Sequence, residues 1–134
     1  MKHTLRLLAV AALLACSDAF KPNIENVAGA YNLQSLITTD VTDTTDWVAA
    51  GTTLSLALNT NGTTTGHIFA PGAGVGGSDF EADLAGTWTL TGDTVTFTQT
   101  ADTFLRDMAF TARENRLSGD QTFSGTRIRA VLTK

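Results

Sequence analysis

Apolar and polar positions alternate with a period of two through most of this chain. The clearest run covers residues 80–90, where Phe80, Leu84 and Trp88 stand at even positions and mostly polar side chains at odd positions. Such alternation predicts a half-buried β-strand with its apolar side chains on one face. The same pattern predicts seven further strands, at residues 27–38, 53–58, 63–69, 94–98, 108–112, 117–123 and 126–133.

The connections between these segments are short and rich in turn-forming residues. Asn61 and Gly62 form a hairpin signal because both tolerate positive φ, and Gly92 and Gly125 mark similar turns. Short connections make successive strands antiparallel neighbours, which is a meander. We therefore expect an all-β fold of about eight antiparallel strands that closes as a small up-and-down barrel, since closure leaves no exposed sheet edge. A two-sheet β-sandwich is the alternative.

If the barrel closes, its first and last strands must pair. The expectation is that residues 31–37 lie against residues 128–133, because two long strand edges would otherwise stay exposed.

Composition agrees with this fold and limits the partners. Thr occurs 24 times in 134 residues, and Thr is poor in helices but favourable on a pleated, half-solvated surface. The formal net charge is −4, and an acidic surface repels phosphate backbones, so we expect no binding to nucleic acid. A domain of this size buries a core without metals or disulfides. We expect a monomer without a cofactor.

The first residues have the pattern of an export signal. Lys2 and Arg6 form a basic head, nine apolar residues follow at 7–15, and Cys16 comes next. A run of nine is too short to span a bilayer, which needs about 20 residues, but it suits the apolar region of a secretory signal. Residues 13–16, Leu-Leu-Ala-Cys, resemble the lipobox of bacterial lipoproteins, in which cleavage precedes a diacylated cysteine.

Lipidation explains both the position of Cys16 and its uniqueness, since the chain has no second cysteine with which it could form a disulfide. We expect a signal peptide at 1–15, a lipidated Cys16 with a polar tether at 16–26, and the barrel domain at 27–134. The lipoprotein resemblance implies an anchor in the bacterial cell envelope, and Ser17 after the cysteine implies the outer membrane. The alternatives are cleavage after Ala19, which gives a soluble secreted protein, or a cytosolic chain with an incidental cysteine.

Motifs along the barrel domain resemble those of a known family. Gly29-x-Tyr31 opens the first strand, a Leu-x-Leu-x-Leu strand runs into Asn-Gly, Gly-Thr-Trp stands at 86–88, and a basic-aliphatic strand closes the chain. Behind a lipobox, this order resembles the small bacterial lipocalin-like lipoproteins. The resemblance implies a calycin-type barrel in which Gly29 and Tyr31 match the opening Gly-x-Trp of lipocalins. It also implies that Arg127 or Arg129 packs over the Tyr31 ring where the barrel closes.

Inward aromatic side chains are the candidate ligand-binding residues. An eight-stranded barrel is just wide enough for side chains to fill it, so these rings either form a solid core or line a cavity. An inward cavity of roughly 300 Å³ or more would favour a ligand, and the glycine-rich loop at 71–77 would then cover its mouth. The candidate cavity residues are Tyr31, Phe69, Trp88, Phe97 and Phe110.

No motif predicts catalysis or metal binding. His67 is in phase with Thr65 and Phe69, which indicates a surface residue of a strand. Residues 72–77 match G-x-G-x-x-G, yet they lead into a strand and not into the helix that dinucleotide binding requires. The acidic residues lack the order of calcium loops and predict a solvated acidic face; they are Asp40, Asp43, Asp46, Asp79, Glu81 and Asp83.

These observations predict a membrane-anchored extracytoplasmic lipoprotein with a lipocalin-like barrel that binds a small hydrophobic ligand. We do not expect an enzyme. The alternative function is that of a ligand-free structural or protein-interaction lipoprotein of the cell envelope, with a solid barrel that displays an acidic, Thr-rich face to a partner.

Overall fold

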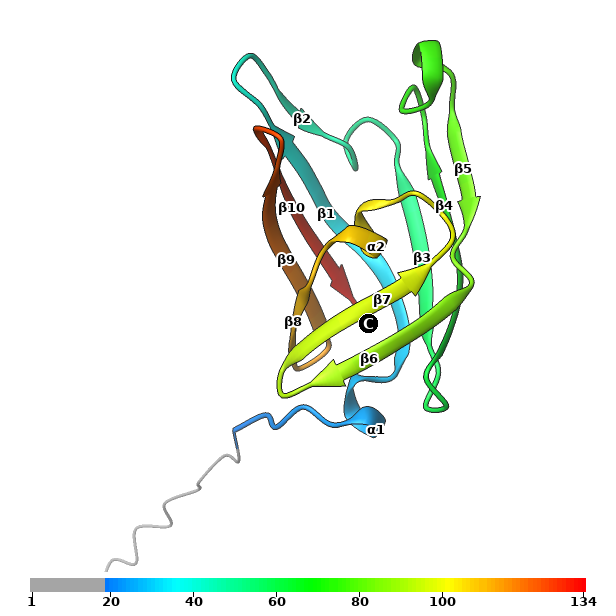
Figure 1. The fold of residues 1–134 in the computed structure, drawn as a ribbon, viewed down its shortest axis with the longest axis vertical. Coiled ribbons are helices and arrows are strands. Elements are labelled where there is room, and N and C mark those ends of the chain that lie inside the picture. The colour runs from blue at the N-terminus through cyan, green and yellow to red at the C-terminus, as the bar shows by residue number, and fades with distance from the viewer. Residues whose placement is uncertain (1–18) are drawn as a thin grey trace, which may run out of the picture.

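The computed structural model describes residues 19–134, which form one sheet rolled into a barrel (Figure 1). The expected signal peptide and Cys16 lie outside the described residues. No helix in the described part is long and apolar enough to cross a membrane. The strands are β1 (Gly29–Thr39), β2 (Thr44–Asp46), β3 (Thr53–Leu58), β4 (Thr63–Ala70), β5 (Phe80–Asp83), β6 (Gly86–Thr91), β7 (Thr94–Gln99), β8 (Phe110–Arg113), β9 (Arg116–Phe123) and β10 (Thr126–Thr133). The helical segments are α1 (Ile24–Val27), α2 (Phe104–Asp107) and the 3₁₀ turn η1 (Val75–Gly77).

Eight of these strands form a closed ring. The order is β1-β3-β4-β6-β7-β8-β9-β10, with β10 pairing back to β1, and the pairings are antiparallel. β2 forms a short hairpin with the end of β1. β5 pairs with the end of β4, and β6 pairs with the start of β4. The expected all-β meander barrel is confirmed, and the two-sheet sandwich is not what forms.

Pairing of the first strand with the last closes the ring. The β1–β10 register runs from Asn32 opposite Thr133 to Thr39 opposite Arg127. Leu36 lies opposite Ala130, and both side chains are buried inside the barrel. This closure confirms the pairing expected from the argument about exposed strand edges.

The long strand expected at 80–90 is divided into β5 and β6. Both parts pair along the same edge of β4, β5 at its end and β6 at its start, and the backbone is irregular between them at residues 84 and 85. The alternation continues across the break: Leu84 is fully buried and Trp88 is 3% exposed, while every odd-numbered neighbour is exposed. Gly86 follows the break because a Cβ there would collide with the carbonyl oxygen of Thr98 on β7.

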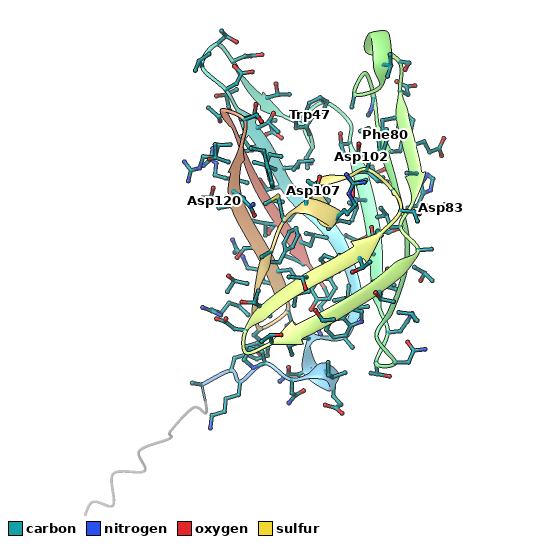
Figure 2. The ribbon with its side chains drawn as sticks, in the orientation of Figure 1. Trp47, Phe80, Asp83, Asp102, Asp107 and Asp120 are labelled. Atoms are coloured by element: carbon teal, nitrogen blue, oxygen red, sulfur yellow. The ribbon has the colours of Figure 1, made fainter. Side chains whose placement is uncertain are left out.

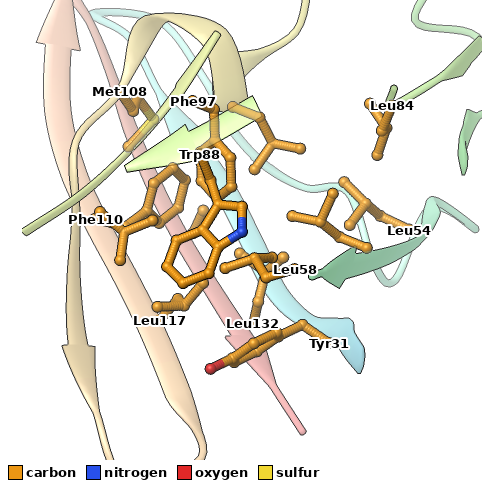
Figure 3. Packing of buried hydrophobic residues seen from close by; sticks show 14 of the residues in the cluster. Tyr31, Leu54, Leu58, Leu84, Trp88, Phe97, Met108, Phe110, Leu117 and Leu132 are labelled. Atoms are coloured by element: carbon orange, nitrogen blue, oxygen red, sulfur yellow. The ribbon is translucent and has the colours of Figure 1, made fainter. Parts of the chain in front are cut away.

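The interior of the ring is packed with apolar side chains (Figure 3). Phe97 and Phe110 meet edge to face with their ring centroids 5.6 Å apart. The Trp88 indole is buried as expected, and its Nε1–H donates to the carbonyl oxygen of Asn59 at 2.8 Å. The buried indole nitrogen is therefore hydrogen-bonded within the protein. The other large, fully buried residues are Tyr31, Leu56, Leu58, Leu84, Leu105, Leu117 and Leu132.

One end of the barrel, which we call the closed end, is sealed by α1 and by the last residue, Lys134. The buried Tyr31 hydroxyl donates to the carbonyl oxygen of Val27 at 2.6 Å, and burial raises the Tyr31 pKa to about 12, so the proton stays in place. The Lys134 ammonium lies 5.4 Å from the centre of the Tyr31 ring. It also donates to the carbonyl oxygens of Asn26 at 2.6 Å and Ala28 at 2.7 Å.

The cation over Tyr31 is thus Lys134, and the expectation of Arg127 or Arg129 was wrong. In an antiparallel pair the start of β1 meets the end of β10, so Arg127 lies opposite Thr39 at the far end of the strand. Gly29 does take part in the closure. Its φ is +145°, and a Cβ there would stand 3.0 Å from the Lys134 side chain.

Replacing Lys134 by Met should lower the free energy of unfolding by about 0.5–2 kcal/mol, because the cation–π contact and two charge-assisted hydrogen bonds are lost at a partly exposed site. Arg129→Met is the matched control and should change stability by less than about 0.5 kcal/mol, since Arg129 is exposed and makes no ion pair within the described residues. Urea denaturation measures both. A larger loss in the Arg129 variant would contradict the assignment of Lys134.

Candidate functional site

The five aromatic residues expected to line a cavity do not form one. Tyr31, Trp88, Phe97 and Phe110 are at most 5% exposed and belong to the packed core. Phe69 lies on the outer side of β4, half-buried, because alternation puts it out of phase with the buried Ile68. The expectation that Phe69 faces inward was wrong for this reason. These core side chains fill the half of the barrel next to the closed end, which we call the closed half.

The other half of the barrel wall is incomplete between β7 and β8. These strands pair only at Thr94 opposite Thr111 and Val95 opposite Phe110. Residues 100–109, which include α2 and which we call the plug segment, pack beside β7 where the pairing stops (Figure 1). Leu105 and Met108 are buried, and the plug segment's own hydrogen bonds are local, such as Met108 N–H to Phe104 O at 3.1 Å. Apolar packing therefore holds the plug segment.

A pocket of about 200 Å³ opens between the plug segment and the ends of β1, β3 and β4. We call it the mouth pocket; Figure 2 shows Trp47, Phe80 and Asp102 near one another at this end of the barrel. The Trp47 indole is held in place by a hydrogen bond from its Nε1–H to the Thr38 hydroxyl at 3.0 Å. The apolar walls of the mouth pocket are made by Leu36, Trp47, Ile68, Ala70, Phe80 and Phe104.

Two of the lining residues are buried threonines. Thr52 is 3% exposed and Thr103 is 7% exposed, and both line the mouth pocket. Neither Oγ1 atom has a hydrogen-bond partner within residues 19–134. A buried hydroxyl that is left unpaired costs about 1–3 kcal/mol. The mouth pocket therefore combines an apolar surface with two hydrogen-bonding groups that the protein does not satisfy.

The rim of the mouth pocket carries charge. Asp102 contributes to the lining, and its carboxylate accepts a hydrogen bond from the Arg106 guanidinium at 2.6 Å. Arg106 also contacts Asp107 at 3.0 Å, and these two hydrogen-bonded carboxylates raise the pKa of the guanidinium further. The ion pair is exposed, so it is screened by water and adds little to stability. Arg106 thus neutralises the charge of Asp102, the charged residue that lines the mouth pocket.

The acidic residues form no metal site in the described part of the chain. The Asp40 carboxylate stabilises the turn in which it lies: its Oδ1 accepts hydrogen bonds from Thr42 N–H, the Thr42 hydroxyl and Asp43 N–H. These donors lower the pKa of the Asp40 carboxyl. Arginines of the later strands form ion pairs with other acidic residues. Arg113 pairs with Asp93 at 2.9 Å, and Arg127 pairs with Asp120 on the adjacent strand at 2.6 Å.

The glycine-rich loop has no dinucleotide-binding geometry. Residues 71–79 connect two antiparallel strands, β4 and β5, through η1, and no long helix follows the glycines. Gly76 and Gly77 have φ values of +67° and +80°, which only glycine adopts readily. The loop was expected to cover the barrel mouth, and one of its residues, Ala73, does line the mouth pocket.

A second, larger hollow of about 440 Å³ lies on the outside of β8, β9, β10 and β1. Most of its lining side chains point outward, as Ser35 and Ile37 do on either side of the buried Leu36, so it is a depression in the outer face of the sheet. Size alone would favour this hollow as the functional site. We favour the mouth pocket because it has buried, unpaired polar groups within apolar walls, the combination that ligand pockets use for affinity and orientation.

The residues that distinguish the mouth pocket were missed in the sequence. Trp47 and Thr52 lie in a turn between strands, and Thr103 and Phe104 lie in a segment with no period-two pattern. The available signals were weak: a single Trp in a polar stretch, and a gap in the alternation between residues 99 and 108. Neither signal says which side chains meet in space.

Comparison of this chain with protein-family models, with curated proteins and with solved structures gave no match.

His67 lies on the outer face of β4, as expected, and links β4 to β5. Its Nε2 is 2.7 Å from Glu81 Oε1 and its Nδ1 is 3.1 Å from Asp83 Oδ1. Hydrogen bonds to Asp83 and then to Glu81 raise the pKa of the imidazole above its usual 6.5. Protonation of the ring thus strengthens a side-chain link between two strands whose backbones are already paired.

The stabilisation from His67 should be fully present below about pH 6.5 and should be lost as the pH rises through the raised pKa of the folded state. The difference in melting temperature between the wild type and His67→Gln should therefore be larger at about pH 5.5 than at about pH 9. Thr65→Gln, an outward substitution on the same strand, is the control and should show no such dependence. A pH-independent difference for His67→Gln would contradict this role.

Proposed function

We propose that this protein is a lipid-anchored, extracytoplasmic β-barrel that binds a small, mostly apolar ring molecule in the mouth pocket. The observation that carries the proposal is the composition of that pocket. Two aromatic side chains, Phe80 and Phe104, and the indole of Trp47 surround a space that the core does not fill. Aromatic and aliphatic walls with a few polar groups are typical of small-molecule sites.

The size of the mouth pocket limits the ligand. Its volume of about 200 Å³ falls short of the roughly 300 Å³ that we expected for a ligand cavity, so only a small molecule fits. A cavity of about 150 Å³ with apolar walls is sufficient to bind benzene. The ligand we propose is therefore a compact molecule with one or two rings. A long acyl chain is too large, because the closed half of the barrel is filled by Trp88, Phe97 and Phe110.

The anchoring part of the proposal rests on the basic head, the apolar run and Cys16 of the sequence. The geometry of the described residues is compatible with it. The chain enters the barrel at the closed end, where Phe20 and Ile24 pack against the core and α1 lies at the bottom of Figure 1. Trp47 and Phe80, which line the mouth pocket, lie toward the opposite end (Figure 2). A barrel tethered through its N-terminus to the bacterial outer membrane would keep the pocket accessible from the aqueous side.

The alternative, a ligand-free structural or interaction lipoprotein, has one observation in its favour. The closed half of the barrel is a solid core, and the larger hollow lies on the outer face, where Asp120 and Arg129 contribute to its lining. A protein partner would use this outer face and leave the mouth pocket unchanged.

Binding can be followed through the two tryptophans of the chain. Trp47 lines the mouth pocket and Trp88 lies in the core, so a ring probe should shift the indole N–H signal of Trp47 and leave that of Trp88 nearly unchanged. We expect this result when the full chain carrying Cys16→Ser is titrated with phenol or with toluene and observed by ¹⁵N–¹H NMR. The Cys16→Ser substitution removes the proposed acyl group, which would otherwise compete for the probe.

A pocket-filling variant provides the matched control for this titration. Ala70→Phe places a ring in the mouth pocket and should abolish the Trp47 shift, whereas Thr65→Phe adds the same ring to the exposed face of β4 and should preserve it. Equal shifts of Trp47 in all three proteins, or no shift in any of them, would rule out the mouth pocket as the binding site.

The anchor has a separate test. In its bacterial host the Cys16→Ser chain should move from the detergent-extracted membrane fraction to the soluble fraction and should lose palmitate labelling, because a stable anchor requires the acyl chains that only Cys16 can carry. Replacing Ser17 by Ala should leave both the membrane fraction and the labelling unchanged. Membrane retention of the Cys16→Ser chain with undiminished labelling would refute the lipoprotein assignment.

A further inference from the structure

The buried polar side chains of the barrel fall into two groups. The Thr64 hydroxyl and the Gln99 amide nitrogen are hydrogen-bonded in the interior: the hydroxyl donates to Leu84 O at 2.9 Å, and the amide nitrogen donates to Thr64 Oγ1 at 3.1 Å. Thr52 and Thr103 have no such partner for their hydroxyls within the described chain, and both lie in the walls of the mouth pocket. Gln99 Oε1 is also unpaired, but Gln99 does not line that pocket.

The local structure does not explain why these two hydroxyls are unpaired. Thr103 occupies the position before α2 where a threonine side chain normally caps the helix, yet its hydroxyl makes no capping hydrogen bond. The backbone N–H of Thr52 donates to Trp47 O at 2.9 Å, whereas the Thr52 hydroxyl has no hydrogen-bond partner within the described residues. Valine has nearly the same shape as threonine and would remove both unpaired groups without loss of packing.

We infer that Thr52 and Thr103 recognise a hydrogen-bonding oxygen on the ligand, so that the mouth pocket selects a neutral ring molecule with one hydroxyl or carbonyl group. The inference rests on the proposed function and specifies its ligand. The two threonines come from different segments, the turn before β3 and the plug segment, so a ligand that bonds both would link the plug segment to the barrel. A threonine hydroxyl both donates and accepts, so it suits either kind of oxygen.

The charges around the mouth pocket favour a neutral ligand. Asp102 is the charged side chain in the lining, and an anionic ligand would meet its carboxylate. A cation would find that carboxylate already bound by Arg106 at 2.6 Å. Further acidic residues stand next to lining residues in the sequence, Asp46 before Trp47 and Asp79 before Phe80, and these exposed carboxylates repel anions further.

Phenol and toluene form the matched probe pair, because they differ by a hydroxyl in place of a methyl group on the same ring. The experiment measures the dissociation constant of each probe from the Trp47 indole N–H shift, in the full chain carrying Cys16→Ser. Thr52→Val and Thr103→Val should each weaken phenol binding about five- to tenfold and should leave toluene binding unchanged or tighter. Thr53→Val, an exposed neighbour on β3, is the control and should affect neither probe.

The melting temperatures of the free variants provide a second readout. Thr52→Val and Thr103→Val should melt at or above the temperature of the parent chain, because each removes an unpaired buried hydroxyl. A clear loss of stability in both variants would show that the hydroxyls already have partners in the free protein, which would overturn the inference.

The outcomes separate this inference from the proposed function. If both probes bind and neither valine variant changes the ratio of their dissociation constants, recognition by Thr52 and Thr103 is refuted while the mouth pocket remains a binding site. An equal weakening of phenol and toluene would also refute it, since only the shape of the pocket would then matter. If neither probe shifts the Trp47 signal in the parent chain, the proposed function fails and the inference fails with it.

Discussion

Pairing between β1 and β10 is the constraint on which the rest of this structure depends. It joins the two ends of the meander and is the pairing in the ring whose strands lie farthest apart along the chain. Because the ring is closed, every strand has an inside and an outside, and the period-two pattern then decides which side chains fill the core. The same pairing fixes the chain end beside the start of β1, so Lys134 reaches the Tyr31 ring and the carbonyl oxygens next to α1.

The two halves of the barrel differ because β7 separates from β8 after two paired positions. In the closed half the strands stay paired and Trp88, Phe97 and Phe110 fill the lumen. In the other half the plug segment replaces the missing pairing, and it is held by packing of side chains such as Leu105. A short helical segment cannot match the shape of the space that a paired strand would occupy. The mouth pocket is the volume left between the plug segment and the strand ends, which is why it is small and why backbone ladders do not satisfy its polar groups.

Much of the fold follows from alternation, because burial of one strand face is a local property that sequence shows directly. The inward positions of Leu84, Trp88 and Ala130 were predictable in this way, as was the pairing of the first and last strands. The two errors differ in kind. Phe69 was assigned to the cavity although alternation within its own strand puts it in phase with His67 on the surface. The cation near Tyr31 was taken from the wrong end of β10, which depends on how β1 and β10 pair. The mouth pocket could not be predicted, since Trp47, Thr52 and Thr103 lie outside the alternating segments and meet only after closure.

Inter-strand proton NOEs between β1 and β10 test the closure most directly. We expect close cross-strand contacts in the full chain between Leu33 and Leu132, between Leu36 and Ala130, and between Thr38 and Ile128. NOEs between β10 and β9, such as those linking Ala130 and Gly119, provide the internal reference that β10 is folded. A spectrum with the β9–β10 contacts present and the β1–β10 contacts absent would contradict the closed barrel, and with it the division into a filled half and an open mouth.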